Sequence, residues 1–164
     1  MKKILMLLFV GLIIFVSSGI AEEIKVLNLD DANSIATLIK TDMDVKSEGN
    51  GSVKITTLWP TVISLGEIDL NGVDKTKLMY QVQVKSENLE GNAYLEMWCF
   101  VNGGQYVSRG MNSTIDGTTD WKAIETPFFL KAGEKADKVI LNIVINGKGS
   151  VWVDHAVLNK EPLE

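Results

Sequence analysis

The stretch YLEMWCFV at residues 94–101 decides the fold of this chain, because its side chains alternate strictly between two kinds of surface. In an extended strand, successive side chains point to opposite faces. One face would carry the mid-sized apolar side chains Leu95, Met97, Cys99 and Val101, and the other would carry Tyr94, Glu96, Trp98 and Phe100. We expect the first set to face a hydrophobic core and Cys99 to be an inert buried thiol.

Two further segments repeat this alternation. Residues 77–85 place Leu78, Tyr80, Val82 and Val84 on one side, and Lys77, Met79, Gln81, Gln83 and Lys85 on the other. Residues 139–146 place Val139, Leu141, Ile143 and Ile145 on one side, and Ile140, Asn142, Val144 and Asn146 on the other. Each strand is therefore predicted to have an apolar core face and a mixed outer face that carries amides.

The rest of the sequence predicts more strands of this kind, separated by turns. The predicted strands are Ile24–Leu29, Asp44–Ser47, Ser52–Thr57, Thr61–Leu70, Lys77–Ser86, Asn92–Asn102, Gln105–Arg109, Trp121–Leu130, Lys138–Asn146 and Ser150–Leu158. The predicted turns are Glu48–Gly51, Asn71-Gly72, Glu90–Asn92, Asn102–Gly104, Asp116-Gly117 and Asn146-Gly147. Only Asp30–Lys40 is typical of a helix, capped by Asp30 or Asp31. The pattern predicts an all-β protein with one antiparallel β-sandwich.

The N-terminus resembles an export signal. Lys2 and Lys3 precede an apolar run over residues 4–16, and small residues at Gly19 and Ala21 have the spacing that a signal peptidase reads. We expect residues 1–21 to be a signal peptide, residues 22–160 a single domain and residues 161–164 a polar tail. The alternative is an uncleaved membrane anchor, for which the run is short. The expected location is secreted or periplasmic.

The charge and the cysteine content of the chain limit the kinds of partner and of covalent cross-link that we expect. The chain has a formal net charge of −5 and a single arginine, Arg109, so it is a poor candidate for binding nucleic acid or anionic lipid. Contact with a membrane is expected only through an uncleaved signal segment. Cys99 is the only cysteine, so no intrachain disulfide can form and the apolar core must stabilise the fold.

The sequence gives little support to an enzyme. His155 is the only histidine, which argues against a catalytic triad or a histidine-rich zinc site. Cys99 and the serines lie outside recognisable nucleophile motifs. Glu96 is a conceivable glycosidase carboxylate, but the pattern places no second acid opposite it. We therefore expect no catalytic residues.

Several short motifs resemble a known family. They are Tyr94–Trp98, Gly117–Trp121, Gly149–Asp154, Gly49–Ile55 and Leu27–Asp31. Together they are similar to the galactose-binding-domain-like jelly rolls, which include many secreted carbohydrate-binding modules. The resemblance implies a jelly-roll β-sandwich and a structural calcium ion, with Asp30 and Asp154 as side-chain ligands and backbone oxygens near Gly51 and Ser52. His155 departs from the pattern, where a second acid is more usual. The alternative is that Asp30 or Asp31 caps a helix while Asp154 and His155 make local hydrogen bonds.

The mixed faces suggest a shallow ligand cleft. Its candidate residues are Gln81, Gln83, Glu96, Trp98, Tyr106, Ser108 and Arg109. An aromatic ring can pack against the C–H face of a sugar, while amides, carboxylates and a guanidinium bind its hydroxyls. The alternative is that Glu96 and Arg109 form a cross-strand pair and Trp98 only covers an apolar patch.

These observations support three functions in order. The first is an exported, non-catalytic module that binds carbohydrate or a related polar ligand. The second is a structural or protein-interaction jelly-roll domain of the cell envelope, and the third is a hydrolase-associated domain.

Overall fold

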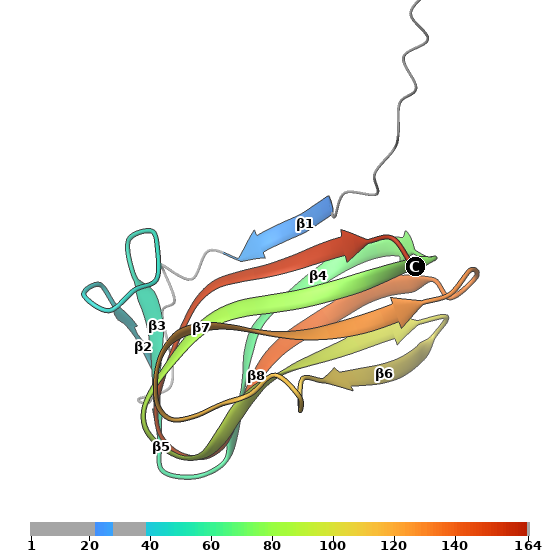
Figure 1. The fold of residues 1–164 in the computed structure, drawn as a ribbon. Helices are drawn as coiled ribbons and strands as arrows, with labels where there is room; N and C mark the ends of the chain where they lie inside the picture. The colour runs from blue at the N-terminus through green and yellow to red at the C-terminus, as the bar shows by residue number, and fades with distance from the viewer. Residues whose placement is uncertain (1–21, 28–38, 164) are drawn as a thin grey trace, which may run out of the picture.

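A computed structural model describes residues 22–27 and 39–163 of the chain (Figure 1). Its eight strands are β1 (Glu22–Leu27), β2 (Ile39–Asp42), β3 (Ser52–Thr57), β4 (Thr61–Val73), β5 (Thr76–Val101), β6 (Gly104–Arg109), β7 (Ile115–Leu130) and β8 (Ala136–Glu161). All strand pairs are antiparallel. Among the described residues there is no helix, so none is long and apolar enough to cross a membrane. The expected signal peptide and Asp30 lie outside the described residues.

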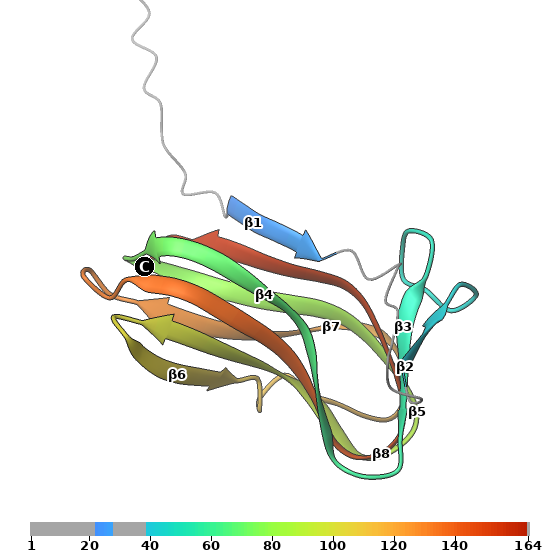
Figure 2. The same cartoon turned by 180° about the vertical axis from the view of Figure 1, so that it is seen from behind.

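Two long strands, β5 and β8, build both layers of the sandwich. Figures 1 and 2 show that each runs along one layer, bends sharply and returns in the other. The first half of β5 pairs with β7 and with the second half of β8, which also pairs with β1 and β3. The second half of β5 pairs with β6 and with the first half of β8, which also pairs with β4. We call these groups the first layer and the second layer.

The bend replaces two of the predicted turns. Residues 90–92 and 146–147 were expected to separate strands, but they lie inside β5 and β8, where Gly91 pairs with Gly147. A Cβ atom on Gly147 would lie 1.7 Å from the Glu90 carbonyl oxygen, and one on Gly91 would lie 2.1 Å from that of Asn146. The glycines thus let two backbones meet at a corner, which the sequence pattern alone cannot distinguish from a chain reversal. The other predicted turns at Asn71-Gly72 and Asp116-Gly117 likewise lie inside β4 and β7.

The core contains the apolar side chains that the alternation predicts. The inward faces expected for residues 77–85, 94–101 and 139–146 are confirmed, since their members are at most 6% exposed. Cys99 is a buried free cysteine, and burial raises the pKa of its thiol to about 12, as expected for an inert group. Tyr80 is also fully buried, and its hydroxyl has no hydrogen-bond partner in the structure.

Two predictions near the N-terminus are wrong. Residues 44–47, expected as a strand, form an irregular loop, and Ile39 and Lys40, expected at the end of a helix, belong to strand β2. Hydrogen bonds from side chains stabilise this loop in place of strand pairing. The Asp42 carboxylate accepts hydrogen bonds from the amides of Asp44 and Val45, both at 3.1 Å. Such local carboxylate bonds compete with strand pairing.

Candidate functional site

The candidate site lies on the outer face of the second layer, where four strands place side chains in cross-strand rows. One row consists of Ser64 on β4, Asn142 on β8, Glu96 on β5 and Arg109 on β6. The rows on either side contain Tyr94 and Trp98, which lie two residues before and after Glu96 on the same face. A polar row is therefore flanked by two aromatic side chains.

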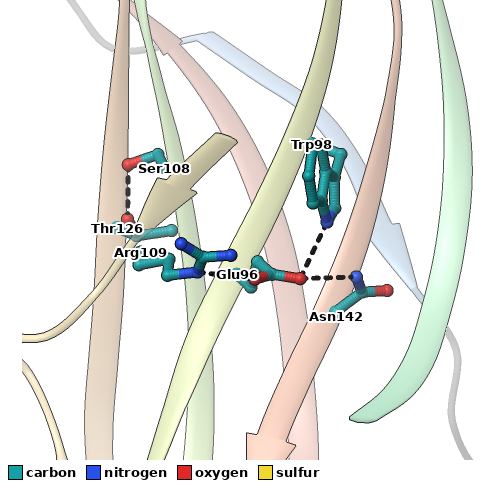
Figure 3. A network of polar contacts seen from close by, with 6 residues as sticks. All are labelled: Glu96, Trp98, Ser108, Arg109, Thr126 and Asn142. Carbon is teal, nitrogen blue, oxygen red and sulfur yellow. Dashed lines mark hydrogen bonds and ion pairs between the residues drawn. The ribbon is translucent and has the colours of Figure 1, made fainter. Parts of the chain in front are cut away.

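Glu96 is the centre of this row. Its Oε2 atom accepts a hydrogen bond from Arg109 Nε at 2.8 Å, and its Oε1 atom accepts one from Trp98 Nε1 at 2.8 Å (Figure 3). Asn142 Nδ2 also donates to Oε1, at 3.3 Å. Glu96 is only 7% exposed although it points away from the core, so its neighbours cover the carboxylate. The cross-strand pair that was the alternative reading of Glu96 and Arg109 is thus present.

The network holds Glu96 in its charged form. Burial opposes the charge and is the largest single effect, but the hydrogen bonds from Arg109, Trp98 and Asn142 outweigh it, so the pKa of Glu96 lies below its ordinary value. A glycosidase acid needs the opposite shift, because it must hold a proton near neutral pH. Glu96 is therefore suited to positioning its neighbours and unsuited to general acid catalysis.

Trp98 and Arg109 are the members of the network that can reach a ligand. The Trp98 ring is partly exposed and is oriented by its bond to Glu96. The Arg109 side chain is 48% exposed, and no bond other than that from Nε to Glu96 engages its guanidinium within the described residues. A fixed ring on one side of Glu96 and a guanidinium with free N–H donors on the other suit a ligand with a flat apolar face and hydroxyl groups.

Gln81 and Gln83 lie elsewhere. They are in the first half of β5 and point outward from the first layer, so the core separates them from Trp98 (Figure 1). Gln81 Nε2 donates instead to Glu125 Oε2 on β7 at 3.2 Å. The alternation correctly places both glutamines on an outer face, but the bend in β5 puts that face on the opposite side of the sandwich.

Ser108 and Tyr106 also lie outside the predicted cleft. Ser108 pairs with Met97 and Tyr106 with Cys99, so both have the inward parity of β6. Ser108 Oγ lies 2.8 Å from Thr126 Oγ1 and donates to the Pro127 carbonyl at 2.6 Å, which joins the edges β6 and β7 (Figure 3). Of the seven predicted ligand residues, the structure brings only Glu96, Trp98 and Arg109 together.

Asn142 is the residue that sequence reasoning missed as a member of the site. It is 7% exposed on the outer face of β8, where its amide contacts Glu96. Its position in the alternation of residues 139–146 placed it on an outer face, and a polar residue between Leu141 and Ile143 was a usable signal. The pairing of β8 with β5 was needed to connect it to Glu96.

The described half of the predicted calcium site is engaged in hydrogen bonds within the protein. Asp154 Oδ2 accepts hydrogen bonds from Ser47 N, Ser47 Oγ and Glu48 N at 2.8, 2.9 and 3.1 Å, and Oδ1 accepts one from His155 N at 2.8 Å. These donors occupy both oxygens, whereas calcium needs oxygen ligands around it. The part of the chain that the structure describes contains no cluster of three or more histidine, cysteine or acidic side chains suited to a metal. Asp30 lies outside that part, so calcium binding stays a prediction.

No protein-family model and no curated protein matches the sequence. Among solved structures, the Family 16 Carbohydrate Binding Module-2 is 10% identical, with a TM-score of 0.52 over 74% of this chain and 84% of that chain. The CBM22-1 and GH10 modules of the Clostridium thermocellum xylanase Xyn10B, complexed with xylohexaose, are 9% identical, with a TM-score of 0.51 over 77% of this chain and 24% of that chain. A cyclase from Fischerella sp. TAU is 14% identical, with a TM-score of 0.51 over 72% and 67%. At these identities the similarity shows a shared fold, which can host different functions.

These structures confirm the predicted resemblance to carbohydrate-binding jelly rolls and the predicted all-β sandwich at the level of the fold.

Proposed function

We propose that this chain is an exported, non-catalytic module that binds carbohydrate through the outer face of its second layer. The observation that carries the proposal is the network in which the buried Glu96 carboxylate holds the Trp98 ring at one oxygen and the Arg109 guanidinium at the other. Because both partners are held before a ligand arrives, binding would cost less conformational entropy than ordering two free side chains.

The chemistry of the face supports a saccharide. Trp98 offers a ring for the C–H face of a pyranose, and Arg109 offers donors for its hydroxyl oxygens. Tyr94 provides a second aromatic group on the same face, four residues from Trp98. At about 3.3 Å per residue the two positions lie ~13 Å apart, which leaves room for more than one sugar ring along β5. The two similar modules described above also come from carbohydrate-binding proteins.

Export is part of the proposal and rests on residues 1–21, with their basic start, apolar run and small residues before the expected cleavage point. The non-catalytic role is supported by the lowered pKa of Glu96 and by the occupation of both of its oxygens.

A glycan array tests the proposal. The probes are neutral and acidic oligosaccharides, including xylohexaose, cellohexaose, β-1,4-galactotriose and trigalacturonic acid. We expect at least one neutral glycan to bind with an affinity that Trp98→Ala lowers by at least about tenfold. Trp59→Ala is the matched control, because Trp59 is 59% exposed in the connection between β3 and β4 and takes no part in the network. No binding across the array would favour the protein-interaction function instead.

A further inference from the structure

A second cleft lies at the open edge of the sandwich, between β6 and β7. Its volume is about 600 Å³, within the range of about 300–1,000 Å³ that is usual for small-molecule sites. Val101 lines it from the core, and Tyr106 and Phe128 contribute aromatic rings. Phe129 also borders the cleft, but it pairs with Lys77 and therefore has the outward parity of β7. Tyr106 has the inward parity of β6 and Phe128 that of β7, so the two rings come from the facing edges of the two layers.

The walls of this edge cleft are tied together by hydrogen bonds. Asn102, in the turn between β5 and β6, donates from Nδ2 to the Gly133 carbonyl at 3.0 Å and from its backbone amide to the Lys135 carbonyl at 3.0 Å. Lys135 N donates back to Asn102 Oδ1 at 3.2 Å. Below the cleft, the Ser108 hydroxyl joins β6 to β7 through Thr126 and Pro127. The cleft is therefore preformed, which lowers the entropic cost of binding.

A glycine of the same strand fixes the position of the Tyr106 ring. A Cβ atom on Gly104 would lie 2.9 Å from Tyr106 Cε2, so the ring packs directly over the glycine. Tyr106 remains 55% exposed, and Phe128 is partly exposed. Large aromatic side chains held at a cleft and open to water present faces that a ligand with an apolar surface can cover.

The polar groups of the cleft favour a neutral ligand that carries hydroxyls. Lys131 and Glu134 line it together, and their charges are opposite. Within the described residues the Tyr106 hydroxyl and the Lys131 ammonium have no partner, and Glu134 uses Oε2 to accept from the Lys131 amide at 2.7 Å. A purely apolar ligand would remove water from these groups without replacing their hydrogen bonds. A charged ligand would be repelled by either Lys131 or Glu134.

We infer that the edge cleft is a second saccharide site, separate from the Trp98 face, which takes one or two neutral sugar rings between Tyr106 and Phe128. Tyr106 then binds a ligand, as the sequence predicted, but in a different place. The inference shares only its ligand class with the proposed function and needs no residue of the Glu96 network.

The test is a titration of the ¹⁵N-labelled protein with xylohexaose, cellohexaose and β-1,4-galactotriose, with trigalacturonic acid as the charged probe. We expect at least one neutral saccharide to shift the amide signals of Gly103, Gly104 and Glu134. Tyr106→Ala should weaken the affinity measured at these signals by at least about tenfold. Phe128→Leu, which keeps an apolar side chain against the core, should also weaken it. Gly104→Ala should weaken it as well, since the new methyl group displaces the Tyr106 ring without removing it.

Two variants separate this site from the first. Trp98→Ala should leave the affinity at the edge cleft unchanged, and so should Met111→Ala, which removes a similarly exposed apolar side chain outside the cleft. The inference is overturned if no neutral saccharide shifts these amides, if Trp98→Ala abolishes the shifts, or if only the apolar dye 1-anilinonaphthalene-8-sulfonate causes them. Shifts confined to the Trp98 indole would support the proposed function and contradict the second site.

Discussion

At the scale of single residues, Glu96 controls the candidate face. A carboxylate that is 7% exposed is costly unless charged and polar partners surround it. Arg109, Trp98 and Asn142 satisfy it from three different strands. The same bonds orient the two side chains that can contact a ligand, so the stability of the face and its shape depend on one group.

Replacing Glu96 with glutamine should lower the free energy of unfolding by about 2 kcal/mol at pH 7, since the amide loses the charge-assisted bond to Arg109. The loss should depend on pH. Folding lowers the pKa of Glu96 below its ordinary value of 4.5, so its contribution is complete above that value and is lost as the pH falls through the lowered pKa. Urea unfolding of wild type and Glu96→Gln from pH 7 to pH 3 measures this.

The gap between the two proteins should narrow below pH 4.5, and a gap that stays constant would contradict the account. Glu125→Gln is the matched control, because Glu125 is an exposed acid that meets Gln81 on the other layer. We expect that variant to differ from wild type by less than about 0.5 kcal/mol throughout.

Asp154 has a comparable structural role at the loop of residues 43–51. Three hydrogen bonds from Ser47 and Glu48 tie the loop to Asp154 on β8. Asp154→Asn should therefore destabilise the protein by about 2 kcal/mol, because one oxygen becomes a donor that faces other donors. Thermal or urea unfolding measures the change. Asp44→Asn, at an exposed position in the same loop, should have little effect. Equal melting temperatures for the two variants would mean that Asp154 does not anchor the loop.

At the scale of elements, the corner of β5 and β8 is the most sensitive position. Gly147→Ala would place a methyl group 1.7 Å from the Glu90 carbonyl oxygen, so the two strands would have to separate. We expect a loss of at least about 2 kcal/mol, as for other overpacked positions. Gly117→Ala is the comparison, because no atom lies within 4 Å of its Cβ and only its φ of +56° is unfavourable, at about 1 kcal/mol. Similar unfolding curves for the two variants would contradict the packing of the corner.

The same corner separates the features of the strands that the sequence could predict from those that it could not. Alternation identified the inward side chains of residues 77–85, 94–101 and 139–146, since burial depends on local parity. It could not show that β5 continues through Gly91, because the same residues favour a turn or a bend. As a result Gln81 and Gln83 were grouped with Trp98, although the bend carries them to the other layer. Tyr106 and Ser108 were misplaced because they were grouped with Arg109, although side chains one and three residues apart on a strand point to opposite faces.

At the scale of the whole molecule, the two proposed saccharide sites lie on different surfaces of the sandwich. The outer face of the second layer contains the Glu96 network, and the open edge between β6 and β7 contains the cleft of Tyr106 and Phe128. A module with two such surfaces could engage two parts of one polysaccharide and gain affinity through the high effective concentration of the second contact.

The most direct test of the central claim is the response of the tryptophan indole N–H signals to a bound glycan. The chain has four tryptophans, and their indole signals can be assigned by single substitutions to phenylalanine. Titration with the neutral oligosaccharide that binds best on the array should shift the Trp98 indole signal, whose proton is donated to Glu96, and leave that of the exposed Trp59 in place. Saturable binding that leaves the Trp98 signal unmoved would contradict the assignment of this face as the carbohydrate site.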